Sequence, residues 1–159
     1  MNSPYLIARK WTRTDRSAIT DPAGQTQFEV LGRLRRKKVL TLADPAGLQV
    51  ATVSRVGWAV RYQVTAGNAQ ATVSLRGIFR PGYVIDTTTG QLRTRGRISG
   101  RSYEVSRGTA TVASVRHERS LRGGVAVDIG DGEDAVLLLA AVLVLEWIRE
   151  ERREQAAAG

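Results

Sequence analysis

Hydrophobic and polar positions alternate along most of the chain. Between residues 5 and 129, short segments with an apolar residue at every second position are separated by turn sequences. In one segment Val60, Tyr62 and Val64 alternate with Arg61 and Gln63. A period of two is typical of β-strands, and we expect about twelve of them. The expected strands cover residues 5–12, 16–20, 26–31, 38–43, 48–54, 59–65, 70–76, 82–86, 91–97, 101–107, 110–117 and 123–129.

One of the turn sequences between these segments occurs twice. DPAG occurs at residues 21–24 and again at residues 44–47, where proline and glycine favour a type I turn. Strands joined by short turns pair antiparallel, and a meander that returns on itself leaves no open edge. The sequence therefore predicts a mainly β fold, a closed antiparallel β-barrel.

The alternation ends at residue 131. Residues 131–134, DGED, place carboxylates where a helix start favours them. Residues 135–145, AVLLLAAVLVL, have no polar face, and Glu146 interrupts the apolar run before Trp147 and Ile148. We expect a helix over about residues 133–153 in a single domain of residues 1–154, with residues 155–159 as a frayed tail.

A helix that is apolar on all sides must be buried in protein or in lipid. A transmembrane helix needs about 20 apolar residues, and the run at residues 135–148 is shorter. Its length of about 21 Å matches the roughly 23 Å of a seven-residue strand. A barrel of about twelve strands is too wide for its own side chains to fill. We therefore expect the helix to fill the barrel and no transmembrane span.

The charge is one-sided, with 24 Lys and Arg against 15 Asp and Glu and a formal net charge of +9. This excess favours an anionic partner, although an arginine-rich composition is also typical of GC-rich coding sequences. The chain has no cysteine and a single histidine, His117, which excludes disulfides, thiolate sites and multi-histidine metal sites. No cofactor is predicted. The N-terminus lacks a signal-peptide pattern, so we expect a cytoplasmic protein, peripheral at the inner membrane face.

Two basic clusters are candidate sites for lipid headgroups, and ordinary solvation is the alternative for both. The first lies between two expected strands and consists of Arg33, Arg35, Arg36, Lys37 and Lys38. The second consists of Arg93, Arg95 and Arg97, which share one face if residues 91–97 form a strand, with Arg101 on the next strand.

The remaining polar residues carry no catalytic pattern, and we expect a protein that is not an enzyme. His117, beside charged neighbours at a strand end, is interpreted as a surface residue. The dispersed tryptophans do not form a base-stacking platform, which disfavours nucleic acid. Four acids before the helix are weak candidates for calcium, but helix capping explains them better: Asp128, Asp131, Glu133 and Asp134.

Residues 127–140, VDIGDGEDAVLLLA, closely resemble the VDI-x-DGED-hydrophobic signature of LURP-one-related proteins. The upstream layout is also similar, with YLIARKW at residues 5–11 and K-x-L-x-L-x-D-x-x-G at residues 38–47. The likeness covers residues 4–148. It implies a tubby-like barrel of twelve strands around a hydrophobic helix, related to tubby and phospholipid scramblase domains. Tubby domains bind phosphoinositides through a basic patch, so the resemblance implies a site of that kind without assigning positions.

Charge, the arginine pattern and this resemblance together predict a monomeric, non-enzymatic binding module. It would dock on anionic phospholipid or phosphoinositide headgroups through a basic outer face. Two alternatives stay open. One is a scramblase-like lipid translocator, in which the helix would enter the bilayer. The other is a structural or protein-interaction domain with an acidic protein partner.

Overall fold

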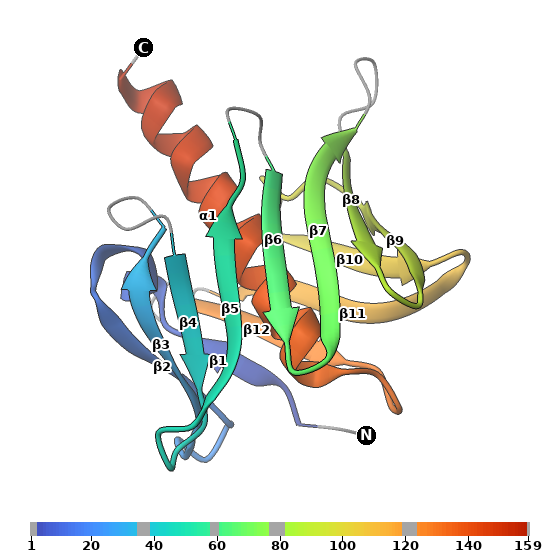
Figure 1. Ribbon diagram of the computed structural model, residues 1–159. Coiled ribbons are helices and arrows are strands. Elements are labelled where there is room, and N and C mark those ends of the chain that lie inside the picture. Colours follow the sequence, from blue (N-terminus) through green and yellow to red (C-terminus); the bar gives the residue numbers. More distant parts are fainter. Residues whose placement is uncertain (1–2, 35–38, 58–60, 77–81, 119–123, 159) are drawn as a thin grey trace.

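The computed structural model describes residues 3–34, 39–57, 61–76, 82–118 and 124–158. Within them, antiparallel strands form one closed barrel around a long helix (Figure 1). The predicted fold class is thereby confirmed, and each expected strand has a counterpart, although the expected strand residues 38, 59–60 and 123 lie outside the described part of the chain. In chain order the strands are β1 (Tyr5–Ile7), β2 (Arg16–Thr20), β3 (Thr26–Arg33), β4 (Val39–Ala43), β5 (Gln49–Arg55), β6 (Arg61–Ala66), β7 (Ala69–Arg76), β8 (Gly82–Thr87), β9 (Gly90–Arg95), β10 (Ser102–Arg107), β11 (Ala110–Glu118) and β12 (Gly124–Ile129).

Closure of the ring depends on the short first strand. Each strand pairs with its neighbour in sequence, and β1 also pairs with β12. Ile7 of β1 lies opposite Val125 of β12 on one side and Ile19 of β2 on the other. Because the ring has no edge, backbone groups along every strand find partners within the sheet.

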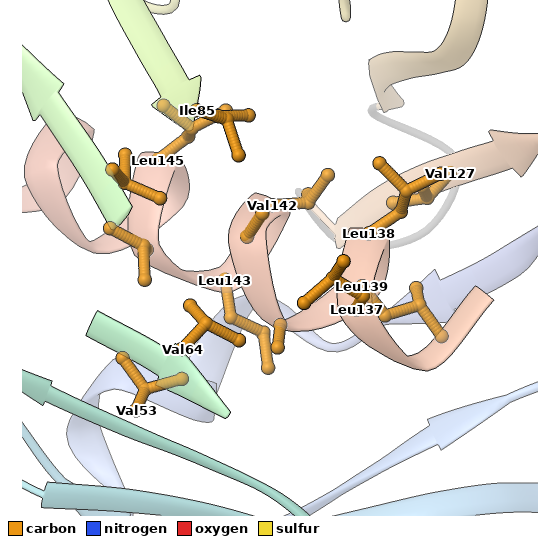
Figure 2. Close-up of a cluster of buried hydrophobic side chains, with 14 of the residues drawn as sticks. Val53, Val64, Ile85, Val127, Leu137, Leu138, Leu139, Val142, Leu143 and Leu145 are labelled. Atoms are coloured by element: carbon orange, nitrogen blue, oxygen red, sulfur yellow. The ribbon is translucent and has the colours of Figure 1, made fainter. Parts of the chain in front are cut away.

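Helix α1 (Ala135–Ala158) fills the barrel, as the apolar run predicts. Figure 2 shows Leu143 beside Val53 and Val64, and Leu145 beside Ile85. The helix side chains that are fully shielded from solvent are Leu139, Val142, Leu143, Val144 and Leu145. This placement gives the apolar helix the protein surroundings that it requires.

The helix bounds differ from the expected 133–153. Gly132 has a φ of 78°, a left-handed conformation that places it outside the helix. Asp134 then accepts a hydrogen bond from the Leu137 N–H with its Oδ1 at 3.1 Å, the contact of an N-cap residue. At the other end the helix includes residues 155–158, expected to be frayed, whose Gln and Ala residues are good helix formers.

Two expected strands are shorter than the alternation suggests. The strand expected over residues 5–12 ends at Ile7, and a 3₁₀ helix, η1 (Arg9–Arg13), follows it. This turn buries Trp11 against Trp147 of α1, with ring centroids 6.3 Å apart. The strand expected over 91–97 ends at Arg95, because Gly96 turns the chain with a φ of 81°.

Candidate functional site

Because neighbouring strands in the ring are antiparallel, successive connections lie alternately at the two ends of the barrel. Each connection from an even-numbered strand to an odd-numbered one lies at the end where α1 begins, and each from an odd to an even strand lies at the opposite end. Helix α1 enters from the first end and leaves through the second, where Figure 1 places the C-terminus beyond the strands. The distribution of charge follows this division.

The end where α1 begins, called the acidic end below, comprises the connections at residues 21–25, 44–48, 67–68, 88–89, 108–109 and 130–134. In the sequence these connections contain no Lys or Arg. Their acidic residues are Asp21, Asp44, Asp131, Glu133 and Asp134.

The opposite end, called the basic end below, comprises the described residues 8–15, 34, 56–57 and 96–101 of the connections that run from odd-numbered to even-numbered strands. Asp15 is their one acidic residue in the sequence. Their exposed basic residues are Arg13, Arg97 and Arg101. The same connections in the sequence also contain basic residues whose side chains lie outside the described ones: Arg9, Lys10, Arg35, Arg36, Lys37, Lys38, Arg80, Arg119 and Arg122. Among the described residues, the connections at the two ends therefore carry an excess of opposite charge.

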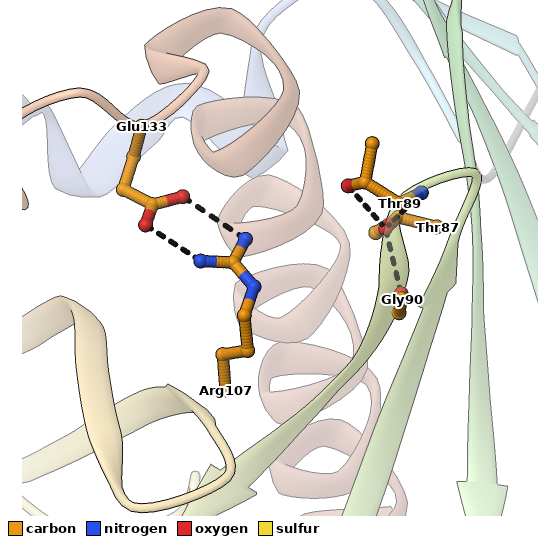
Figure 3. A network of polar contacts seen from close by, with 5 residues as sticks. All are labelled: Thr87, Thr89, Gly90, Arg107 and Glu133. Atoms are coloured by element: carbon orange, nitrogen blue, oxygen red, sulfur yellow. Dashed lines mark hydrogen bonds and ion pairs between the residues drawn. The ribbon is translucent and has the colours of Figure 1, made fainter.

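Most of the four carboxylates that the sequence offers as weak calcium candidates bind other groups of the protein. Glu133 forms a two-pronged ion pair with Arg107, with oxygen–nitrogen distances of 2.7 and 3.1 Å (Figure 3). Asp128 lies 3.4 Å from Arg116, Asp134 caps α1, and Asp131 is exposed. Among the described residues, no group of three or more acidic or histidine side chains is placed to hold a metal ion. The neighbouring contacts in Figure 3, between Thr87, Thr89 and Gly90, stabilise the β8–β9 turn.

The first basic cluster lies only partly within the described residues. Arg33 ends β3, and its Nε is 3.0 Å from Asp15 Oδ1, while its guanidinium also donates to the Arg13 carbonyl. Arg33 thus stabilises the β1–β2 connection. Arg35, Arg36, Lys37 and Lys38 lie outside the described residues.

The second basic cluster does not form the expected stripe. Arg93 and Arg95 are exposed on β9, but Arg97 lies beyond the strand in the turn that its carbonyl closes with Gly100 N–H. The expectation that all three share one strand face is therefore wrong for Arg97. Arg101 lies in the same connection and is exposed.

The described residues of the two basic clusters, Arg33 on one hand and Arg93, Arg95, Arg97 and Arg101 on the other, do not converge on one patch. Strands β3 and β9 are six places apart in the ring in either direction, so they lie on opposite sides of the barrel. What they share is the end of the barrel: Arg33 ends β3, and Arg95, Arg97 and Arg101 lie at the end of β9 and in the connection after it. The candidate site is therefore a basic end rather than a basic side.

Three tyrosines surround α1 where it approaches the basic end. The Tyr62 hydroxyl donates to Glu151 Oε1 at 3.1 Å, and the Tyr103 hydroxyl donates to Glu146 Oε2 at 2.8 Å. The Arg152 guanidinium lies over the Tyr83 ring, 5.4 Å from its centroid. Burial, together with the charge of Glu151, raises the pKa of Tyr62 to about 12. Each tyrosine thus fixes one charged side chain of the emerging helix.

His117 belongs to the same region, and its interpretation as a surface residue is wrong. It follows Val115 at a spacing of two on β11, so both side chains face the lumen. Its Nε2 lies 2.6 Å from Glu146 Oε1, and Arg149 approaches the same nitrogen. The sequence feature that indicates a buried partner is Glu146, because an acid inside an otherwise apolar helix requires a polar group to bind it.

Two hollows beside the exit of α1 carry both signs of charge. One, of about 120 Å³, is lined by Thr12, Arg13, Arg33, Trp147, Glu150, Glu151 and Glu154. The other, of about 320 Å³, is lined by Leu34, Arg55, Trp147, Glu151, Glu154, Gln155 and Ala158. Their glutamates oppose an anion, so anion binding is favoured on the arginines outside these hollows.

A comparison with protein families assigns the chain as a whole. The model of the family described as LURP-one-related matches residues 5–146. The chain belongs to the LURP-one-related family. The match includes every described strand and α1 as far as Glu146, so the resemblance carried by residues 127–140 extends through the barrel.

Among solved structures, the fold of this LURP-one-related chain is similar to an X-ray structure of a protein from Arabidopsis thaliana. The two chains are 21% identical with a TM-score of 0.63, over 92% of this chain and 90% of the other. At this identity the likeness shows the fold alone. No curated protein matches the sequence. Within the described part of the chain, no helix combines the length and the apolar character needed to span a bilayer.

Proposed function

We propose that this protein is a non-enzymatic binding module that docks on anionic phospholipid headgroups through its basic end. The observation that carries the proposal is the segregation of charge between the two ends of the barrel. Membership of the LURP-one-related family and the closed barrel support a domain of the lipid-binding type. Phosphoinositides, with several phosphates per headgroup, are the ligands expected to bind most tightly.

The segregated charge favours a flat anionic surface over a single small anion. Exposed arginines of the described basic end are distributed around the ring, with Arg13 before β2, Arg61 on β6 and Arg101 before β10. Because these arginines lie on separate parts of the ring, one headgroup cannot contact all of them, and a surface that carries many headgroups is the better match. The acidic end would face away, because an anionic surface repels it.

Co-sedimentation with vesicles tests the proposal. Pure phosphatidylcholine vesicles are compared with vesicles that also contain phosphatidylserine or a phosphoinositide, at low and at physiological salt. We expect binding to the anionic vesicles alone, with an affinity that falls as salt rises. Equal binding to neutral and anionic vesicles, or none to either, would refute the proposal.

A matched pair of variants distinguishes the effect of charge at the basic end from the effect of the protein's net charge. Arg97→Gln with Arg101→Gln removes two positive charges from exposed side chains of the basic end. Each loss should weaken binding about fivefold, from about 1 kcal/mol per basic residue near an anionic surface. Thr88→Glu with Thr109→Glu changes the net charge equally at exposed positions of the acidic end. This control should bind with nearly unchanged affinity.

A further inference from the structure

Exposed aliphatic side chains gather at the same end of the barrel as the arginines. Among the described residues, the large hydrophobic side chains that remain exposed are Val39 (43%), Leu48 (66%), Val56 (40%) and Leu75 (39%). Leu48 lies in a turn of the acidic end. The other three lie at the basic end, on or next to strands β4, β5 and β7.

These three side chains occupy one sector of the ring. Val39 begins β4 and is paired with Ser54 of β5 and Arg33 of β3. Val56 follows β5 directly, and its N–H donates to the Arg61 carbonyl of β6 at 2.9 Å. Leu75 is the second-last residue of β7. Neighbouring strands are about 4.8 Å apart, so the sector from β4 to β7 is about 14 Å wide.

Arginines flank the apolar sector on the described strands. Arg33 is the cross-strand partner of Val39, and Arg55 directly precedes Val56. Both are paired within the protein, Arg33 with Asp15 and Arg55 with Glu151, so the phosphate contact is assigned to the exposed Arg61. Arg61 begins β6 between the strands that carry Val56 and Leu75. Aliphatic side chains beside arginines are the composition of surfaces that lie in a membrane interface, since arginine stems cover apolar surface while the guanidinium stays among phosphates.

We propose that Val39, Val56 and Leu75 enter the boundary between headgroups and acyl chains when the basic end docks on an anionic bilayer. The inference rests on the proposed function and adds to it an orientation and a second source of affinity. The strands would then point toward the membrane surface with their basic-end termini, and the acidic end would lie farthest from the membrane. Electrostatic attraction is screened by salt, whereas the contact of aliphatic side chains with lipid is not.

The absence of cysteine from the sequence makes a site-specific test possible. Val39→Cys, Val56→Cys, Leu75→Cys and Leu48→Cys are each labelled with an environment-sensitive fluorophore, and folding is checked by circular dichroism. With vesicles containing phosphatidylserine, labels at positions 39, 56 and 75 should brighten and shift to shorter wavelengths. The label at position 48, at the opposite end, should keep its spectrum in water.

The outcomes distinguish this inference from the proposed function. Protein that co-sediments with anionic vesicles while all four labels keep their aqueous spectra would overturn insertion and leave headgroup docking standing. An equal shift at position 48 would overturn the orientation. Failure of the unlabelled protein to bind anionic vesicles would overturn both.

An affinity measurement gives a second readout without a label. Val39→Ser with Val56→Ser should weaken binding to phosphatidylserine vesicles at physiological salt about tenfold for each side chain, from the apolar area that they would bury. Leu48→Ser is the matched control and should bind as the parent chain does. Equal affinity of all three proteins would contradict insertion.

Discussion

Glu146 on helix α1 and His117 on strand β11 are joined inside the barrel, with 2.6 Å between Oε1 and Nε2. The second oxygen of Glu146 accepts the Tyr103 hydroxyl at 2.8 Å. Glu146 is 6% exposed, so this acid, buried among apolar residues, is held by side chains from two strands. The contacts fix both the rotation and the depth of the helix in the barrel.

Removal of Glu146 should therefore destabilise the fold. Glu146→Ala leaves the Tyr103 hydroxyl and His117 without their acceptor, at a cost of about 3 kcal/mol in the free energy of unfolding. A double-mutant cycle with His117→Ala, measured by urea unfolding, should give a coupling above about 0.5 kcal/mol. Glu150→Ala, one turn further along, is the control. Additive effects of the two changes would mean that the pair is not coupled.

Alkaline pH should destabilise the barrel through its tyrosines. Burial and the charge of Glu151 raise the pKa of Tyr62 to about 12, and burial and the charge of Glu146 raise that of Tyr103 well above its ordinary value. Above about pH 10 the unfolded chain releases phenolic protons that the folded chain retains. The free energy of unfolding therefore falls as pH rises from about 10 toward 12.

Tyr62→Phe isolates one part of this pH dependence. Urea unfolding at about pH 9 and about pH 11 should show a loss of stability that is about 1 kcal/mol smaller in the variant than in the parent chain. Tyr5→Phe is the matched control, because its ring is only partly buried. An identical loss in Tyr62→Phe and the parent would show that Tyr62 does not contribute.

Two glycines with the same backbone conformation should respond differently to substitution. Gly32 and Gly47 have φ values of 89° and 90°, so an alanine is strained at both. A Cβ at Gly32 would lie 2.9 Å from the Val39 carbonyl oxygen, whereas nothing lies within 4 Å of one at Gly47. Gly47→Ala should cost about 1 kcal/mol, and Gly32→Ala clearly more, as measured by thermal unfolding. Equal losses of stability in the two variants would show that strands β3 and β4 move apart enough to accept the added methyl group.

The acids before α1 can be assigned to capping or to calcium by one comparison. Asp134→Ala should lower the stability of the fold by about 1 kcal/mol, and Asp134→Asn by less, because asparagine also caps helices. Addition of calcium should leave the melting temperature of the parent chain unchanged. A calcium-dependent rise that Asp134→Asn abolishes would support a metal site instead.

A core substitution measures how much the central helix contributes. Leu143 is fully buried between α1 and the sheet, so Leu143→Ala should cost about 2–5 kcal/mol. Leu48→Ala, at a position that is 66% exposed, should change stability by no more than about 0.5 kcal/mol. Similar small effects of both would indicate a helix that is loosely held in the barrel.

The sequence by itself determined the strands and the buried helix, because both follow from local patterns. Alternation with a period of two marks a strand with one buried face, and the apolar run at residues 135–145 has no stable place except inside protein or lipid. Strand ends were less predictable: Gly96 ends β9 early, and the burial of Trp11 replaces the end of the expected first strand with a 3₁₀ turn.

Only the tertiary structure decided which polar residues act together. The order of strands around the ring places the arginines of β3 and β9 on opposite sides but at the same end, and it separates the acidic turns from the basic connections. His117 points into the barrel because of its face on β11. It finds its partner Glu146 only because α1 lies inside the barrel. Contacts between residues distant in sequence depend on closure of the barrel, which no local pattern of side chains encodes.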